Sequence, residues 1–204
     1  MQSSADLLDA VLESLDRLQQ RLQGSPARAH DLWYPVDQKK GYRIVNGNKL
    51  REENSVTDYV QGFLDDDLHR HLLATHREVQ LRAGAGTQKG QELDLYVEAV
   101  ANQTTASSPL ATKLLVFIEA KHQDNPEVKT ALDQQLVNRY LRNHSATTGL
   151  FLVYWYRPGP DQKGKVNRLA DLRQLLDQQA QQASANGRLV KSYVLDIRLP
   201  DDQS

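Results

Sequence analysis

The residues of this chain that could do chemistry together are two carboxylates and one amine. Glu119 and Lys121 follow directly on an apolar run at 114–118, and Asp94 lies in an earlier, alternating segment. Residues two apart in a β-strand point to the same face, so Glu119 and Lys121 share a face. A Glu-x-Lys triplet is usually a surface ion pair. An apolar strand, however, has no packing reason to finish with an acid and a base side by side.

The spacing of these residues predicts a metal site. If the strand with Asp94 pairs as a hairpin with the strand ending in Glu119, the two carboxylates lie opposite each other. Carboxylates that close repel each other unless a cation lies between them. Since the chain has no cysteine, oxygen ligands favour Mg²⁺ or Mn²⁺ over zinc. Beside such an ion, Lys121 could orient or help to deprotonate a water, or stabilise charge developing on a phosphate.

Composition narrows the classes of protein. The chain has 204 residues, with 25 Lys and Arg against 26 Asp and Glu, a net charge of −1. This balance excludes a polybasic nucleic-acid binder but not a local basic face. The absence of cysteine excludes disulfides and thiolate chemistry. No apolar run reaches the roughly 18 residues needed to span a bilayer, and no secretory signal begins the sequence. We therefore expect a cytoplasmic protein without a membrane partner.

The N-terminal segment predicts an amphipathic helix. Leu8, Val11, Leu15, Leu18 and Leu22 step by three and four, and Gly24-Ser25-Pro26 stops the pattern. We divide the chain into this helix or linker, residues 1–26, and a domain over 27–204. The helix could pack on its own domain, form a dimer, or connect the domain to a larger protein.

The remaining elements predict an α/β fold. Residues 27–52 have no clear period. A helix is expected from Glu53 to about Thr75, with a later start at Val56 if Ser55 and Asp58 form a capping box. Strands are expected at 78–82, 93–100, 114–118, 149–156 and 189–199, and helices at 126–142 and 166–183. This order is typical of helices packed around one mixed sheet.

Asp94 and Glu119-Ala120-Lys121 in this order of elements resemble the PD-(D/E)xK nuclease superfamily over about residues 50–156, and the likeness extends toward 199. It implies a restriction-endonuclease-like αβββαβ core with an added N-terminal helix. A narrower resemblance is to nuclease-like domains at the ends of large bacterial proteins, some linked to defence against phage. The sequence matched in that case is Arg77-Glu78-Val79, Asp94, residues 118–121, residues 135–141 and Gly149-Leu150.

The resemblance also implies roles for residues. The implied metal ligands are Asp94, Glu119, the carbonyl of Ala120, and Glu53 with Glu52 as the alternative. The implied catalytic set is Asp94, Glu119, Lys121, Glu53 and Gln135, with Lys121 placing the attacking water. The sequence departs from the family pattern at three points. Leu93 rather than proline precedes Asp94, His122 follows Lys121 where glycine is common, and the step from Gln135 to Tyr140 is five, which leaves Gln134 as an alternative.

The resemblance implies a Mg²⁺-dependent deoxyribonuclease, with Mn²⁺ as an alternative ion and antiphage defence as the expected context. A basic stretch before Glu53 could bind phosphates. The candidate nucleic-acid contacts are Lys39, Lys40, Arg43, Lys49, Arg51, His122, Arg139 and Tyr140. The alternative function is a catalytically inactive nucleic-acid-binding or assembly module of the same fold. With either function, the N-terminal helix could bind a second copy or a larger defence protein.

Overall fold

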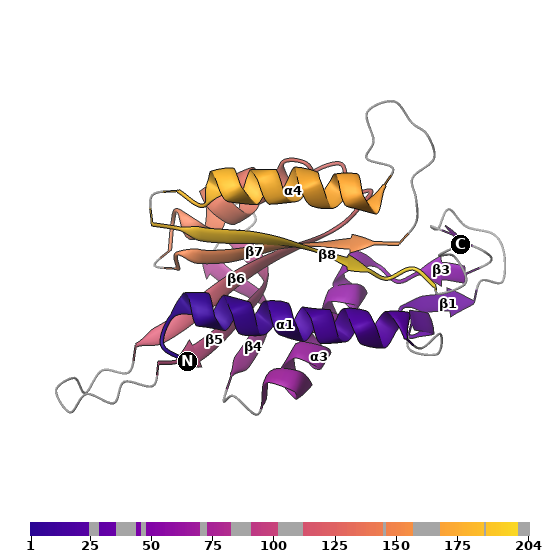
Figure 1. Ribbon diagram of the computed structural model, residues 1–204, viewed down its shortest axis with the longest axis horizontal. Helices are drawn as coiled ribbons and strands as arrows, with labels where there is room; N and C mark the ends of the chain where they lie inside the picture. Colours follow the sequence, from indigo (N-terminus) through magenta and orange to yellow (C-terminus); the bar gives the residue numbers. More distant parts are fainter. Residues whose placement is uncertain are drawn as a thin grey trace.

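A five-stranded mixed sheet forms the centre of the computed structural model (Figure 1). The described residues are 1–24, 29–35, 44–45, 48–69, 73–82, 91–101, 112–144, 146–156, 168–185 and 187–199. The strands are β4 Ala74–Arg82, β5 Gln91–Val100, β6 Lys113–His122, β7 Thr148–Trp155 and β8 Leu189–Asp196, in that spatial order. The pairs β4–β5 and β5–β6 are antiparallel, whereas the pairs β6–β7 and β7–β8 are parallel.

Helices cover both faces of this sheet. Helices α1, Ser4–Gln23, and α3, Glu53–Leu68, lie on one face, and η2, Leu132–Leu141, and α4, Leu169–Ala183, lie on the other (Figure 1). Successive residues of β7 alternate between the two apolar cores, with Leu152 in the α1 and α3 core and Val153 in the other. This confirms the predicted α/β class with a mixed sheet flanked by helices. It also explains the unbroken apolar runs of β6 and β7, because both faces of these strands are buried.

Helix α1 is part of the core. A capping box between Ser3 and Asp6 begins it, and Gly24 ends it, as the sequence predicts. All the leucines of its stripe, together with Val11, are fully buried in the same apolar cluster as residues of α3 and the sheet. The predicted boundary at residue 26 therefore does not separate two hydrophobic cores. The apolar face of α1 is covered by its own sheet, as the first of our three interpretations expects.

Three local expectations differ from the structure. Helix α3 ends at Leu68 rather than near Thr75, because β4 already begins at Ala74. It starts at Glu53, and its N-cap residue Glu52 makes no side-chain capping bond, so the Ser55 and Asp58 capping box is wrong. The helix expected from residue 126 begins at Leu132 and has π-helical hydrogen bonding, after turns at 126–130.

The region without a clear period contains a second, small sheet. Its strands are β1 Trp33–Pro35, β2 Ile44–Val45 and β3 Asn48–Leu50, with β3 in the middle. Strands of two or three residues are too short to show alternation, so no sequence pattern predicts them. Among the helices of the described residues, none is long and apolar enough to cross a membrane.

Candidate active site

Glu119 and Lys121 lie side by side near the end of β6, as their spacing predicts. The Nζ atom of Lys121 is 2.5 Å from Oε1 of Glu119. Both residues are buried, Glu119 with 1% and Lys121 with 7% of its surface exposed. Ala120, between them, faces the opposite way and packs in the core formed with α1 and α3. The strand thus directs an acid and a base into one buried position, with parallel β7 along its other edge.

Asp94 reaches the same position from β5. The antiparallel register pairs Leu95 with Ile118, so the next pair along the ladder would place Asp94 opposite Glu119. The Oδ2 atom of Asp94 accepts a hydrogen bond of 2.9 Å from the backbone N–H of Ala120 and lies 3.6 Å from Nζ of Lys121. The hairpin predicted from sequence therefore brings the two carboxylates to the same amine.

Glu53 joins them from the first turn of α3. Its Oε2 accepts a 2.6 Å hydrogen bond from the backbone N–H of His122 and a 3.3 Å bond from the amide of Asn125. Its Oε1 lies 4.0 Å from Nζ of Lys121. The alternative, Glu52, is the exposed N-cap residue of the helix. The structure therefore places Glu53 with Asp94, Glu119 and Lys121.

A buried hydrogen-bond chain anchors the first turn of α3 to the sheet. The hydroxyl of Tyr154 on β7 donates to Oγ1 of Thr57, at 2.9 Å. The Thr57 hydroxyl in turn donates to the backbone carbonyl of Glu53, at 2.8 Å. Tyr154 and Thr57 are buried. Burial raises the pKa of the Tyr154 phenol, so the hydroxyl stays protonated and remains a donor. The backbone that carries Glu53 is thereby tied to β7.

The site is short of positive charge. Burial, and then the negative charge of Asp94, raise the pKa of Glu119 to about 8. Burial alone would lower the pKa of Lys121, but Glu119 and Asp94 together hold it above its usual value. Three carboxylates surround a single ammonium, because Glu53 also lies near it. Lys121 is therefore charged at neutral pH. The cost of burying charge here appears as the raised pKa of Glu119, whose ionised form is disfavoured.

The donor atoms fit a hard cation in type. Among the described residues, Oε2 of Glu119 is buried and has no hydrogen-bond partner. A buried acceptor without a partner lowers stability unless a bound ligand contacts it. Carboxylate oxygens are the usual ligands of Mg²⁺ and Mn²⁺. In the arrangement seen, however, no group of three or more Asp, Glu or His side chains of the described ranges could hold an ion. The ammonium of Lys121 lies between the carboxylates instead, so a bound ion requires Lys121 to move away from Glu119.

The helix that follows β6 contributes less than the resemblance implies. Gln135 is half-buried and donates a 2.7 Å hydrogen bond to Glu127 rather than to a site carboxylate, while Gln134 is exposed. Tyr140 is buried, and this burial, followed by the charge of Glu119, raises its pKa to about 12. The π-helical geometry of η2 thus places the phenol, not Gln135, near Glu119.

The predicted nucleic-acid contacts fall into three groups. Lys39, Lys40 and Arg43 lie outside the described residues, as does the side chain of Lys49 on β3. His122 and Tyr140 are buried, with 0% and 2% of their surface exposed, because they pack within the two cores. Neither offers a surface to a nucleic acid in this conformation. Arg51 is half-buried, and Arg139 is exposed on η2 next to Tyr140.

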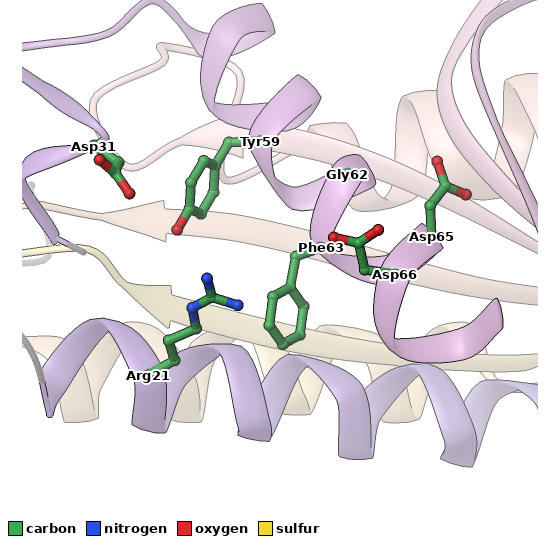
Figure 2. Close-up of a pocket in the computed structure, with 7 residues that line it drawn as sticks. All are labelled: Arg21, Asp31, Tyr59, Gly62, Phe63, Asp65 and Asp66. Carbon is green, nitrogen blue, oxygen red and sulfur yellow. The ribbon is translucent and has the colours of Figure 1, made fainter. Parts of the chain in front are cut away.

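A pocket of about 430 Å³ lies elsewhere, where α3 faces α1. Figure 2 shows Tyr59 and Phe63 of α3 directed toward Arg21 of α1, whose guanidinium carbon is 5.6 Å from the centre of the Phe63 ring. Its other lining residues are Asp31, Gly62, Asp65 and Asp66. None of the site residues lines it. The three carboxylates around Lys121, rather than this pocket, therefore define the candidate active site.

Two contributors to the site were not foreseen. Asn125, which donates to Glu53, lies in the turn directly after β6. The polar sequence Asp124-Asn125-Pro126, just after the strand that carries Lys121, was the available sign that this turn contributes to the site. The polar role of Tyr154 depends on a contact with Thr57, 97 residues away. A sequence pattern does not show such a pair.

In comparisons with known proteins, the sequence matches no family model and no curated protein. The likeness to PD-(D/E)xK nucleases consequently rests on the residues quoted for it. The fold and the site define an α/β protein in which three carboxylates, one of them buried, surround one buried lysine at the edge of a hairpin.

Proposed function

We propose that this chain is a metal-dependent nuclease of the PD-(D/E)xK type that hydrolyses phosphodiester bonds, with DNA as its substrate. The observation that carries the proposal is the position of Nζ of Lys121, within 4.0 Å of the carboxylates of Glu53, Asp94 and Glu119. The unpartnered Oε2 of Glu119 supports it, because an uncompensated buried acceptor is retained at a cost in stability.

Each carboxylate has a defined part in this proposal. Asp94, held by the N–H of Ala120, and Glu119 would bind Mg²⁺ or Mn²⁺, with the carbonyl of Ala120 as a further ligand. Glu53, held by the N–H of His122, would complete the shell directly or through a water. A bound Mg²⁺ would polarise the phosphate, lower the pKa of a water and stabilise the leaving oxygen.

Lys121 would act as a cation rather than as a base. Its pKa lies above the usual lysine value because Glu119 and Asp94 outweigh the effect of burial. An ammonium that stays protonated at neutral pH cannot accept a proton from water. It can donate hydrogen bonds to the attacking water or to a phosphate oxygen, once it has released Glu119. This favours an orienting and charge-stabilising role over deprotonation.

The test is plasmid nicking with Mg²⁺, with Mn²⁺ and with EDTA. Asp94→Asn and Lys121→Met are expected to lose at least about 100-fold in rate, the low end of what a positioned catalytic group contributes. The matched control is Lys113→Met, on the same strand, whose side chain is 69% exposed and pairs with Glu98 of β5 at 3.3 Å. This variant should cleave within about two-fold of wild type, since exposed pairs contribute little.

Two results would count against the proposal. Cleavage by Lys121→Met at the wild-type rate, or cleavage that persists in EDTA, would show that the activity does not arise from this site. If the wild-type protein binds DNA yet cleaves it with neither ion, the result favours the non-catalytic nucleic-acid-binding module.

A further inference from the structure

Arg77 of β4 is nearly buried at the junction of two elements that carry site carboxylates. Its side chain is 11% exposed and lies beside β5, where Arg77 is paired with Leu95. One arm of the guanidinium donates to the backbone carbonyl of Asp94, at 3.5 Å, and the other to the carbonyl of Asn54, at 3.3 Å. Its Nε lies 2.9 Å from the carboxylate of Asp58, one turn further along α3.

These contacts involve the backbone of the site itself. Asn54 directly follows Glu53 in the first turn of α3, and Asp94 is itself a site carboxylate. A planar guanidinium holds its donors in a fixed fork, so it fixes the two carbonyls relative to each other. The separation between the backbone of Glu53 and that of Asp94 is thereby set from β4. The chain from Tyr154 to Thr57 fixes the same helical turn to β7 on the other side.

We propose that Arg77 is a positioning residue that ties the backbone next to Glu53 to that of Asp94, so that both carboxylates can bind one divalent cation once Lys121 has moved. This inference rests on the proposed nuclease function. Groups that orient metal ligands from outside the coordination shell typically change metal affinity or activity by about 10- to 100-fold when they are removed. The contacts of Arg77 with Asp94 and with the first turn of α3 are made to backbone carbonyls. Its effect should therefore appear in metal affinity rather than in affinity for DNA.

The chain offers a matched arginine for comparison. Arg17 of α1 pairs with Asp67 of α3 at 2.6 Å, near the opposite end of the same helix from Glu53. Arg17→Met therefore also removes an arginine tie to α3, but one remote from the carboxylates. A role confined to holding α3 on the protein would make Arg77→Met and Arg17→Met behave alike.

The experiment measures Mn²⁺ binding to the full chain by titration calorimetry, and the Mn²⁺ dependence of plasmid cleavage. Arg77→Met should weaken Mn²⁺ binding about 10- to 100-fold, whereas Arg17→Met should leave it within about two-fold of wild type. With saturating Mn²⁺, Arg77→Met should recover most of its kcat, and its KM for DNA should not change. Arg77→Lys keeps the charge but lacks the fork, so its Mn²⁺ affinity should lie between wild type and Arg77→Met.

The outcomes separate this inference from the proposed function. Equal Mn²⁺ affinity in wild type and Arg77→Met would overturn the positioning role while leaving the nuclease in place. Equal losses in Arg77→Met and Arg17→Met would also overturn it. If Arg77→Met does not fold, Arg77→Lys decides, because full wild-type affinity in that variant would exclude a role for the fork. A wild-type protein that neither binds Mn²⁺ nor cleaves DNA would overturn the proposed function itself.

Discussion

Replacing Glu119 by glutamine should remove a pH-dependent cost from the metal-free protein. Burial and the charge of Asp94 raise the pKa of Glu119 from its usual 4.5 to about 8 in the folded state. Between these two values the folded protein holds a proton that the unfolded chain releases. The free energy of unfolding therefore falls as the pH rises through this window. Glutamine does not titrate, so Glu119→Gln lacks this contribution.

The size of the effect follows from the window. Each pH unit corresponds to about 1.4 kcal/mol for one proton. Between about pH 5.5 and about pH 7.5 the wild type should lose up to ~2.7 kcal/mol relative to Glu119→Gln. The ion pair with Lys121, at 2.5 Å, opposes the rise and is already part of this pKa, so we expect about 2–3 kcal/mol. The glutamine amide would itself lack a partner, a cost of about 1–3 kcal/mol that is the same at both pH values.

The assay is urea unfolding of both proteins in EDTA at the two pH values. The difference between the two proteins cancels the titration of groups that they share. The same series with excess Mg²⁺ is the control, because an ion at the site keeps Glu119 ionised and should reduce the slope. A stability difference that is constant with pH, or that changes in the opposite direction, would refute the reasoning that the buried carboxyl is protonated in this range.

Two further predictions concern the elements that hold the site. Leu18→Ala, at a fully buried position of α1, should lower the free energy of unfolding by about 2–5 kcal/mol, whereas exposed Glu13→Ala should change it by less than about 0.5. An equally small effect of Leu18→Ala would mean that α1 is an appendage after all. Tyr154→Phe should cost about 0.5–1.5 kcal/mol through the lost bond to buried Thr57, and more than Tyr193→Phe, since half-buried Tyr193 donates to exposed Asp16. Urea unfolding measures both, and equal costs for the two tyrosines would contradict the buried role of Tyr154.

Elements with a regular apolar period could be predicted from the sequence. The stripe of α1, the alternation of β5 and the apolar runs of β6 and β7 each reflect one burial pattern, so their positions were predicted to within a few residues. The geometry of η2, the helix after β6, was more difficult to predict. Its stripe, Val128, Leu132, Leu136 and Tyr140, advances by a uniform four residues, more than the 3.6 of an α-helical turn. That step was the available signal of π-helical geometry.

In the candidate site, too, the contacts that follow from local periodicity could be predicted, and those that depend on packing between distant elements could not. The meeting of Asp94 with Glu119 and Lys121 follows from strand periodicity and hairpin pairing, and the structure confirms it. The position of Glu53 was implied only by resemblance, since it depends on how α3 packs across the sheet. Arg77 was quoted for its sequence but given no role. Its contacts join residues 17 and 23 positions away, and no local pattern encodes such a separation.

The charges around Lys121 connect the stability of this protein to its proposed chemistry. Three carboxylates and one ammonium leave two negative charges in a largely buried position. Without a metal, a proton on Glu119 reduces this excess, and burial together with the charge of Asp94 raises its pKa. One divalent cation would neutralise the same excess in full. Proton and metal should therefore compete for Glu119, and metal affinity should fall as the pH is lowered.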